Sequence, residues 1–416
     1  MNPLRQIEQE VLARGREWTR SQLEQQLQEI ANALPAVCGQ SQRRLKKTRW
    51  RSLQLDTVAG AVKLRVRHGY SPAQARWVCP AREHWGLLPY GRKSPELQAR
   101  LAYTATVVGS YEEAEAMAGT WGTPVSDGCV FHQVKRLGEK AGELELPTPK
   151  PSKVEPAFSL VVMMDGWMAR ERGTDWGAGP RAKDPQRVEW REIKSAVIYR
   201  LEQRAENAKG RGLLLEKYAV ATPPETSPVD FGAAVLAESR RRGMGRAQVV
   251  YLVMDDAVWL WALAQDRFPS AVKTLDFHHA QEHLQVVAEV LHGVGSEAAK
   301  AWLKATLHQL RHGKEARVVK KLEELLKPAT PTSRTTQDQA TLTREVSYIK
   351  DHEDHLHYRR MEKDGAPMCS GAVESLGKQF QRRLRGCGQF WTRPGLTHLL
   401  QLCVLVKNKD DYLLRN

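Results

Sequence analysis

The sequence predicts a mixed α/β protein whose sheet is followed by a long helical segment. Apolar runs at 158–164 and 247–254 each end in acidic residues, as buried strands often do. With the strand and helix patterns around them, they give the order β-β-β-α-β-α-β over residues 158–279. Residues 280–361 carry an almost continuous helical pattern instead.

The strands of this sheet are predicted one by one. FSLVVMMDG is a continuous apolar run that ends at Asp165-Gly166, and WREIKSAVIYR and LLLEKYAVAT follow as the next two strands. VDFGAAVLAESRRRG predicts a helix, AQVVYLVMDD a strand ending at Asp255-Asp256, AVWLWALAQDRF a helix, and SAVKTLDFHH a fifth strand. After the helical segment, GAVESLGKQFQRRLRG predicts a basic amphipathic helix and RPGLTHLLQLCVLVKN an apolar one.

The region before residue 158 predicts helices and one hairpin. Apolar residues recur at helical spacing over 3–33 until Pro35 ends the pattern. Alternation about Ala59-Gly60 predicts a β-hairpin, which begins beside a basic run at 43–51. SYEEAEAMAG and VSDGCVFHQVKRLG, separated by TWGTP, predict two capped helices, the pattern of a helix-turn-helix.

Composition restricts the class of protein. The 416 residues are 41% hydrophobic, which excludes a disordered chain, and no apolar run is long enough to span a membrane. The first residues show no signal-peptide pattern, and six cysteines without a CxxC pair fit a reducing cytoplasm. With 63 basic and 48 acidic residues the net charge is +15, so we expect a polyanionic partner; a basic enzyme unrelated to polyanions is the alternative.

Three acidic residues are candidates for metal-dependent chemistry. Asp165 and Asp255 follow buried strands, where a carboxylate is costly unless it has a partner such as Mg²⁺. Glu374 opens a helix after a Gly-rich loop and would be the third ligand of a two-metal site. For any one of these acids alone, a strand-end turn or a charge at a helix N-terminus is the simpler interpretation.

Several of these segments together resemble a known family. MDGW at 164–167, MDDAVWLW at 254–261, LDFHHAQEHL at 275–284, GAPMCSGAVES at 365–375 and CGQFWT at 387–392 resemble, in order, segments of bacterial insertion-sequence DDE transposases of the Mutator-like branch. The resemblance covers residues 158–406 and extends weakly to the front. It implies an RNase H-like fold with an all-helical insertion between the last two acids. One departure is Asp256, which stands where the family usually has Gly.

The resemblance implies a function and a set of site residues. It places Asp165, Asp255 and Glu374 on the catalytic acids that bind Mg²⁺, for which Mn²⁺ can substitute, and His279 on the family's histidine. The activity would be cleavage of element ends and transfer of the 3′-OH to target DNA by a homo-oligomer, expected to be a dimer, in the bacterial cytoplasm at the nucleoid. A transposase-derived DNA-binding protein that no longer cuts, or another RNase H-like nuclease, is the alternative.

The patterns along the chain, together with this resemblance, give a domain organisation. The predicted domains are an N-terminal helix (1–37), a basic β unit like a degenerate zinc ribbon (38–94), a helix-turn-helix (95–140), a linker (141–157), the first part of the RNase H-like core (158–279), the helical insertion (280–361) and the second part of the core with C-terminal helices (362–416). Zinc is not expected, because only Cys38, Cys79 and His84 are in place for a four-ligand site.

Candidate contacts to double-stranded DNA, both the terminal inverted repeats and the target, are mostly basic. They are Arg43, Arg44, Lys46, Lys47, Arg49, Lys135, Arg136, Lys378, Arg382, Arg383 and Trp391. For the basic residues the alternative is a solvated surface. Trp391 would stack on an unpaired base or else pack in the core. His279, which forms an i, i+4 pair with His283, would contact the scissile phosphate or support the acids, or else serve as a capping or packing residue. The histidines of the DHEDHLH run at 351–357 are expected on one solvated helix.

Overall fold

The computed structural model describes residues 2–87, 91–150, 156–173, 176, 187–206, 208, 212–327 and 335–415. Two compact units divide the chain: one comprises Met1–Leu144 with Pro394–Asn416, the other Glu145–Arg393. The domains predicted from the sequence are finer than these units and stay predictions. None of the helices in the described ranges is long and apolar enough to span a membrane.

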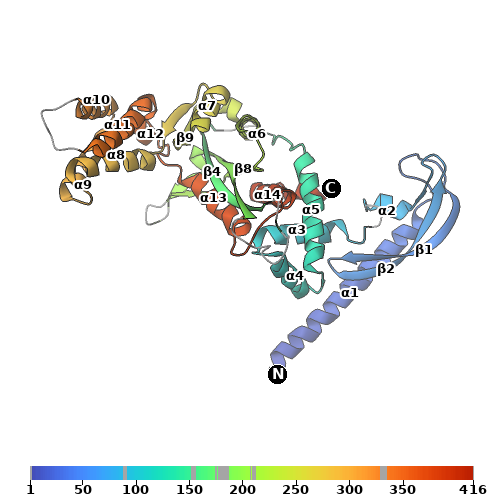
Figure 1. Ribbon diagram of the computed structural model, residues 1–416. Helices are drawn as coiled ribbons and strands as arrows, with labels where there is room; N and C mark the ends of the chain where they lie inside the picture. The colour runs from blue at the N-terminus through green and yellow to red at the C-terminus, as the bar shows by residue number, and fades with distance from the viewer. Residues whose placement is uncertain are drawn as a thin grey trace. The chain divides into compact units, whose positions relative to one another are not determined.

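The first unit begins with a long helix and an antiparallel hairpin. Helix α1 (Pro3–Ala33) lies along the hairpin of β1 (Lys46–Thr57) and β2 (Gly60–Ser71), as Figure 1 shows, and β3 (Arg76–Val78) pairs with β2. The side-chain oxygen of Gln28 accepts the Arg65 N–H at 2.8 Å, tying α1 to β2. The predicted hairpin and its turn are confirmed, because Thr57 pairs with Gly60, which takes a left-handed φ of 108°.

Helices complete the first unit. A short helix, α2 (Pro80–His84), precedes α3 (Pro95–Val107), α4 (Tyr111–Thr120) and α5 (Asp127–Glu143); α14 (Arg393–Asn408) comes from the end of the chain. Ser110 and Ser126 cap α4 and α5 as the sequence predicts. The helices are therefore confirmed, while their use as a helix-turn-helix stays a prediction.

A five-stranded mixed sheet is the centre of the second unit. Its strands are β4 (Leu160–Arg172), β5 (Val188–Arg200), β8 (Tyr218–Thr222), β9 (Val250–Met254) and β10 (Val272–Leu275), in the order β10-β9-β4-β5-β8. Only β5 runs against the others. This arrangement is compatible with an RNase H-like fold. One predicted strand, LLLEKYAVAT, is in fact two elements: β8 joins the sheet, whereas β7 (Gly212–Leu214) pairs with β6 (Arg204–Glu206) in a separate ribbon.

Helices cover both faces of this sheet. Helices α6 (Pro228–Arg241) and α7 (Val258–Arg267) bury Phe231 and Leu263 against Leu160, Val162 and Met164 of β4. On the other face lies α13 (Gly371–Leu384), where the Phe380 ring stacks on Trp167 with centroids 6.2 Å apart. Alternation along β4 therefore assigns one face to even-numbered residues and the other to odd-numbered ones.

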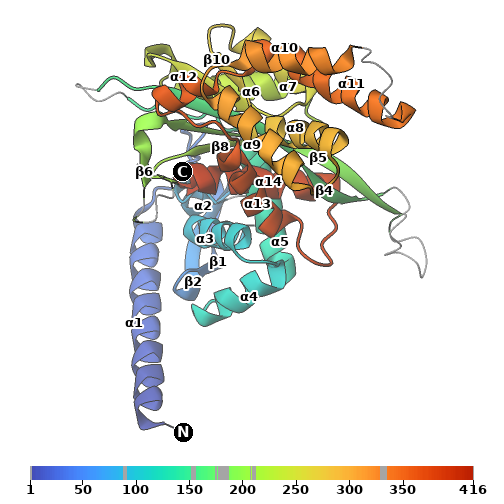
Figure 2. The same ribbon diagram turned by 90° about the vertical axis from the view of Figure 1, so that its left-hand side faces the viewer.

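A helical segment follows β10. It comprises α8 (Phe277–His292), α9 (Glu297–Arg311), α10 (Glu315–Leu326), α11 (Thr336–Asp351) and α12 (Tyr358–Lys363), which Figure 2 shows grouped together. Helices α8 to α11 share one apolar core, which includes Leu284, Leu310, Leu322 and Val346. The helical character predicted for 280–361 is thus confirmed for the described residues.

The histidine run of this segment differs from its prediction. Helix α11 ends at Asp351, a 3₁₀ turn covers Glu353–His355, and His357 precedes α12, so the histidines are not on one solvated helix. The His355 ring packs 4.2 Å from that of Trp261. Hydrophobic contact with α7 explains the difference, because it draws this turn onto the protein rather than into solvent.

Candidate functional site

Asp165 lies within a strand and not at its end, which corrects the sequence-based interpretation. The apolar run does stop there, but β4 continues to Arg172, because β5 pairs with it along its full length and aligns Asp165 with Ser195. Beyond Asp165 the burial alternates, with Trp167 and Ala169 buried. The apolar run of β4 stops at Met164 because β9, its partner on the side away from β5, ends there.

The parallel pairing of β4 with β9 brings two acids together. Its last aligned pair is Met164 with Met254. Asp165 and Asp255 are the residues that follow this pair, so they lie next to each other on adjacent segments of the chain. Asp165 has the same parity as Trp167, which places its side chain on the α13 face of the sheet. The Asp255 carboxylate also accepts the Ala257 N–H at 3.2 Å, and its carbonyl accepts the Trp261 indole N–H at 2.9 Å.

His279 lies in the first turn of α8, not at the end of a strand. Strand β10 stops at Leu275, and the buried Asp276 caps the helix by accepting the N–H groups of His278 at 2.6 Å and His279 at 3.3 Å. An Asp followed by a helical pattern is an N-cap signal that the sequence already carries. His279 is half-buried and lies 3.7 Å from the exposed Glu282, while His283 on the same helix pairs with the buried Glu345.

Glu374 lies in the first turn of α13. Its side chain is half-exposed, accepts the Ser370 hydroxyl at 3.3 Å and lies 3.8 Å from the ammonium group of Lys378. The second carboxylate oxygen of Asp276 accepts the N–H of Ser370, which precedes α13. The chain segments that carry His279 and Glu374 are therefore joined through one buried carboxylate.

The electrostatics connect Asp165 with both of the other predicted acids. Burial first, then the charges of Asp255 and Glu374, raise the pKa of Asp165 to about 6, while the Gly166 N–H and His279 oppose the rise. Burial also raises the pKa of Asp255, with Asp256 and Asp276 adding to the rise and His279 opposing it. The structure thus places Asp165 within electrostatic range of Asp255, Glu374 and His279, and Asp255 within range of His279.

The donor set suits a divalent cation in its chemistry. Carboxylate oxygens are the ligands that Mg²⁺ prefers, and two repelling, partly buried carboxylates are what a cation would relieve. In their present rotamers, no three His, Cys, Asp or Glu side chains among the described residues form a group able to hold a metal ion. Glu374 faces Lys378 instead.

The DNA-contact candidates on and after α13 fall into two classes. Lys378 and Arg382 are exposed. Arg383 is buried beside the Trp391 ring, at 5.3 Å from its centroid. Trp391 is 9% exposed, and its indole N–H donates to the Leu384 carbonyl at 2.7 Å. The packing alternative therefore describes where Trp391 lies.

The other DNA-contact candidates lie in the first unit. All five from Arg43 to Arg49 are exposed; Lys135 is exposed and Arg136 half-buried on α5. Around the first group, exposed aromatic rings alternate with guanidinium groups: Arg49 lies 4.4 Å from the Trp77 centroid, and Arg67 5.0 Å from that of Trp50. Such a basic and aromatic surface suits a nucleic acid backbone.

Residues that sequence reasoning missed support the acids. The sequence pattern assigns Asp276 to a strand and Ser370 only to the GAPMCSGAVES string. It assigns Trp261 to a helix, and no local signal shows that its indole reaches the Asp255 carbonyl. These links depend on segments far apart in the chain.

Comparisons with known proteins give little. No family model matches the sequence, and no curated protein matches it. Among solved structures, the chain is similar to one in a strand transfer complex of the Drosophila P element transposase. The identity is 10%, the match covers 76% of this chain and 92% of that chain, and the TM-score is 0.32. A likeness this weak establishes neither a shared family nor a shared activity.

Proposed function

We propose that this chain is a DNA transposase of the DDE type, resembling the Mutator-like branch of insertion-sequence enzymes, that cleaves element ends and joins them to target DNA. The observation that carries the proposal is the alignment of Met164 with Met254, which sets Asp165 beside Asp255 on the sheet face covered by the Glu374 helix. The ordered family-like segments of the sequence contain these same three acids.

Asp165, Asp255 and Glu374 would hold Mg²⁺ or Mn²⁺. When bound, the ions would supply a nucleophile at neutral pH and charge stabilisation at the scissile phosphate. The protein's own contribution is to hold Asp165 within a fully paired strand and Glu374 in the first turn of α13, whose apolar side packs on the sheet. His279, half-buried in the first turn of α8 and close enough to oppose the pKa rise of both aspartates, would orient the acids or contact the phosphate.

DNA would be held by positive charge from both units. The net charge is +15, and the hairpin of the first unit concentrates exposed Arg and Lys side chains at one end. The pKa of His68 in β2 is lowered by burial and then by Arg51, Arg82 and Arg49, which shows that the local potential is positive. These contacts would position the DNA by its phosphates.

The test is cleavage of a labelled duplex that carries the ends of the encoding element. We expect nicking at the element boundary with Mg²⁺ or Mn²⁺ and none with EDTA. Asp165→Asn and Glu374→Gln should abolish nicking and retain DNA binding, while the control Asp351→Asn, an exposed acid at the end of α11, should cut normally.

Two outcomes would contradict the proposal. If the Asp165→Asn variant cuts DNA at the wild-type rate, the assignment of the catalytic acids is wrong. Tight binding without nicking under both metals would favour a transposase-derived DNA-binding protein, and Asp256→Gly would then be the first reversion to try.

A further inference from the structure

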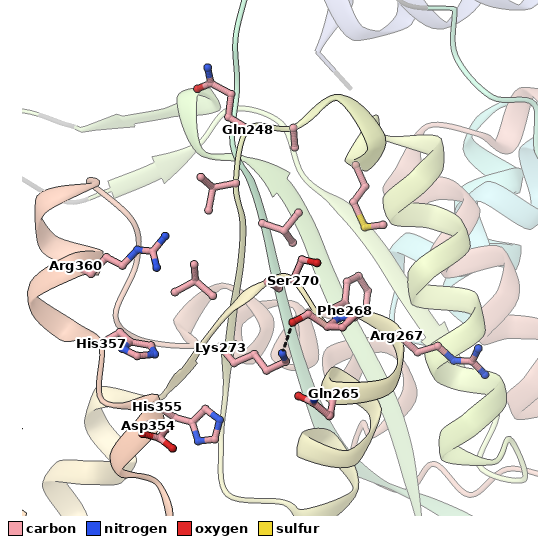
Figure 3. A pocket seen from close by; sticks show the side chains of 17 residues that line it. Gln248, Gln265, Arg267, Phe268, Ser270, Lys273, Asp354, His355, His357 and Arg360 are labelled. Atoms are coloured by element: carbon pink, nitrogen blue, oxygen red, sulfur yellow. Dashed lines mark hydrogen bonds between the residues drawn. The ribbon is translucent and has the colours of Figure 1, made fainter.

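A cavity of about 740 Å³ opens at the beginning of strands β9 and β10, where Val250 and Val272 line it (Figure 3). At the opposite ends of the same strands, the candidate acid Asp255 follows Met254, and Asp276, which caps the helix of His279, follows Leu275. Since a strand rises about 3.3 Å per residue, roughly 13 Å or more of sheet separates the two places. The cavity is therefore distinct from the acid site.

Basic groups dominate the charged lining of this cavity. Its charged residues are Arg267, Lys273, Arg360 and one acid, Asp354; His355 and His357 add two imidazoles. Figure 3 shows Lys273 between the two histidines and the loop that carries Phe268 and Ser270. The lining carries two more positive charges than negative ones, even with both histidines neutral.

Among the described residues, the ammonium group of Lys273 makes no ion pair and donates instead to the Pro269 carbonyl at 3.0 Å. Burial lowers its pKa. The side chain is only partly buried, and an anion beside it would replace a bond to a neutral carbonyl with a stronger, charge-assisted one.

The histidines report the same positive potential. Burial first lowers the pKa of His355 to about 4; the nearby His352, His357 and Lys273 add to the fall, and Asp354 opposes it. The pKa of His357 is also lowered, first by burial and then by Arg360. In addition, the Nδ1 atom of His355 is buried and has no hydrogen-bond partner in the part of the chain that the structure describes. An anion in the cavity would meet the Lys273 ammonium group and, in the neutral tautomer with its hydrogen on Nδ1, an N–H donor from His355.

Arg360 adds a second cation. It lies on α12, is exposed, and its Nε atom is 3.6 Å from Asp364, whose carboxylate also accepts the Tyr251 hydroxyl at 2.8 Å. Its guanidinium group thus retains donors for another acceptor. Arg and Lys together are the usual recognition set for phosphate.

We propose that this cavity is a phosphate-binding site, with Lys273 and Arg360 as its charged ligands and His355 and His357 as its polar wall. The phosphate has two possible sources, the backbone of bound DNA or a free phosphate compound. The proposal does not depend on cleavage, because it concerns residues that lie apart from the acids.

The test compares the wild-type chain with Lys273→Met combined with Arg360→Gln, by calorimetric titration of inorganic phosphate at constant ionic strength. The control is Lys320→Met combined with Arg344→Gln, which removes the same charges from exposed helix surfaces. We expect the pocket variant to bind phosphate at least about tenfold more weakly and the control within about twofold, since each lost charge-assisted bond costs about a factor of ten.

A second measurement identifies the source of the phosphate. If DNA fills the cavity, the pocket variant should lower the slope of log affinity for duplex DNA against log salt by about one to two, and the control should lower it less. An unchanged slope with lost phosphate binding would assign the cavity to a free phosphate compound. Absence of phosphate binding by the folded wild-type chain, or equal binding by the wild type and the pocket variant, would overturn the proposal.

Discussion

The buried carboxylate of Asp276 accepts the backbone N–H of Ser370, 94 residues later in the chain. Its other oxygen caps α8 through His278 and His279. One side chain thus fixes the start of α8 and the start of α13, which carry His279 and Glu374. The acid site is assembled by this hydrogen-bonded connection as well as by the sheet.

Replacing Asp276 with Asn should separate these two roles. An Asn oxygen still caps a helix, but its amide group cannot accept the Ser370 N–H, so α13 loses its link while α8 keeps its cap. We expect a loss of roughly 1–3 kcal/mol in the free energy of unfolding, because a buried N–H is left without its acceptor. If the chain cuts DNA, its turnover should fall roughly ten- to a hundredfold with DNA affinity nearly unchanged.

Ser296→Ala is the matched control for that loss. It removes the cap of α9, where the Ser296 hydroxyl accepts the Ala299 N–H at 3.0 Å, away from the acids. It should cost about 1 kcal/mol of stability and leave cleavage intact. Urea unfolding and single-turnover cleavage measure the two effects. The cleavage rates of Asp276→Asn and Ser296→Ala are compared at temperatures where the same fraction of each variant is folded. Equal rates would show that Asp276 has no positioning role.

Asp165 should make stability depend on pH. Its pKa is raised to about 6 in the folded chain, against an ordinary value of about 4, so folding disfavours its charged form. The stability associated with the protonated carboxyl is fully present below about pH 4 and is lost as the pH rises through about 6. Asp165→Asn should therefore be more stable than the wild type at pH 8 by about 1–2 kcal/mol, after a discount for its partial exposure to solvent.

The difference between Asp165→Asn and the wild type should vanish near pH 4. Urea unfolding at both pH values, without divalent ions, measures it, and Asp351→Asn provides the exposed control. Added Mg²⁺ should then stabilise the wild type more than the variant, since a ligand stabilises only the state that binds it. A variant less stable than the wild type at pH 8 would contradict the electrostatic interpretation.

Trp261 should support Asp255 through the backbone. Its indole N–H donates to the Asp255 carbonyl at 2.9 Å, so Trp261→Phe removes this bond while retaining an aromatic ring. We expect a loss of about 0.5–1.5 kcal/mol in stability and a weaker stabilisation by Mg²⁺. Trp259→Phe, on the same helix with its ring edge-on to Phe231 at 5.7 Å, is the control. If Mg²⁺ stabilises both variants equally, the hydrogen bond from Trp261 does not position Asp255.

The sequence predicts local elements of this protein better than its long-range connections. Turn residues, capping residues and apolar runs predict the hairpin about Gly60, the caps at Ser110 and Ser126, and the strands that contain Met164 and Met254. Each of these signals lies within a few positions of the element that it predicts. The continuation of β4 past Asp165 does not, because it requires a partner strand whose pairing is set by the whole sheet. The end of β10 at Leu275 is likewise decided by the cap that Asp276 forms.

Trp391 provides a test of whether a residue next to the basic helix recognises DNA or holds the fold. Its ring is buried beside Arg383, its indole N–H donates to the Leu384 carbonyl, and its backbone bridges to β4 through Arg170 and Arg172. Trp391→Ala should therefore cost about 3–5 kcal/mol of stability, the range for emptying a buried aromatic site.

The control for Trp391 is Trp190→Ala, because Trp190 is 49% exposed on β5 and lies beside Arg385, with the guanidinium group 4.8 Å from its centroid. That substitution should change stability by about 1 kcal/mol or less. Thermal unfolding and DNA binding of both variants separate the roles. A stable Trp391→Ala chain with weakened binding to DNA ends would restore the base-stacking role, since the ring would then have to leave its packed position when DNA is bound.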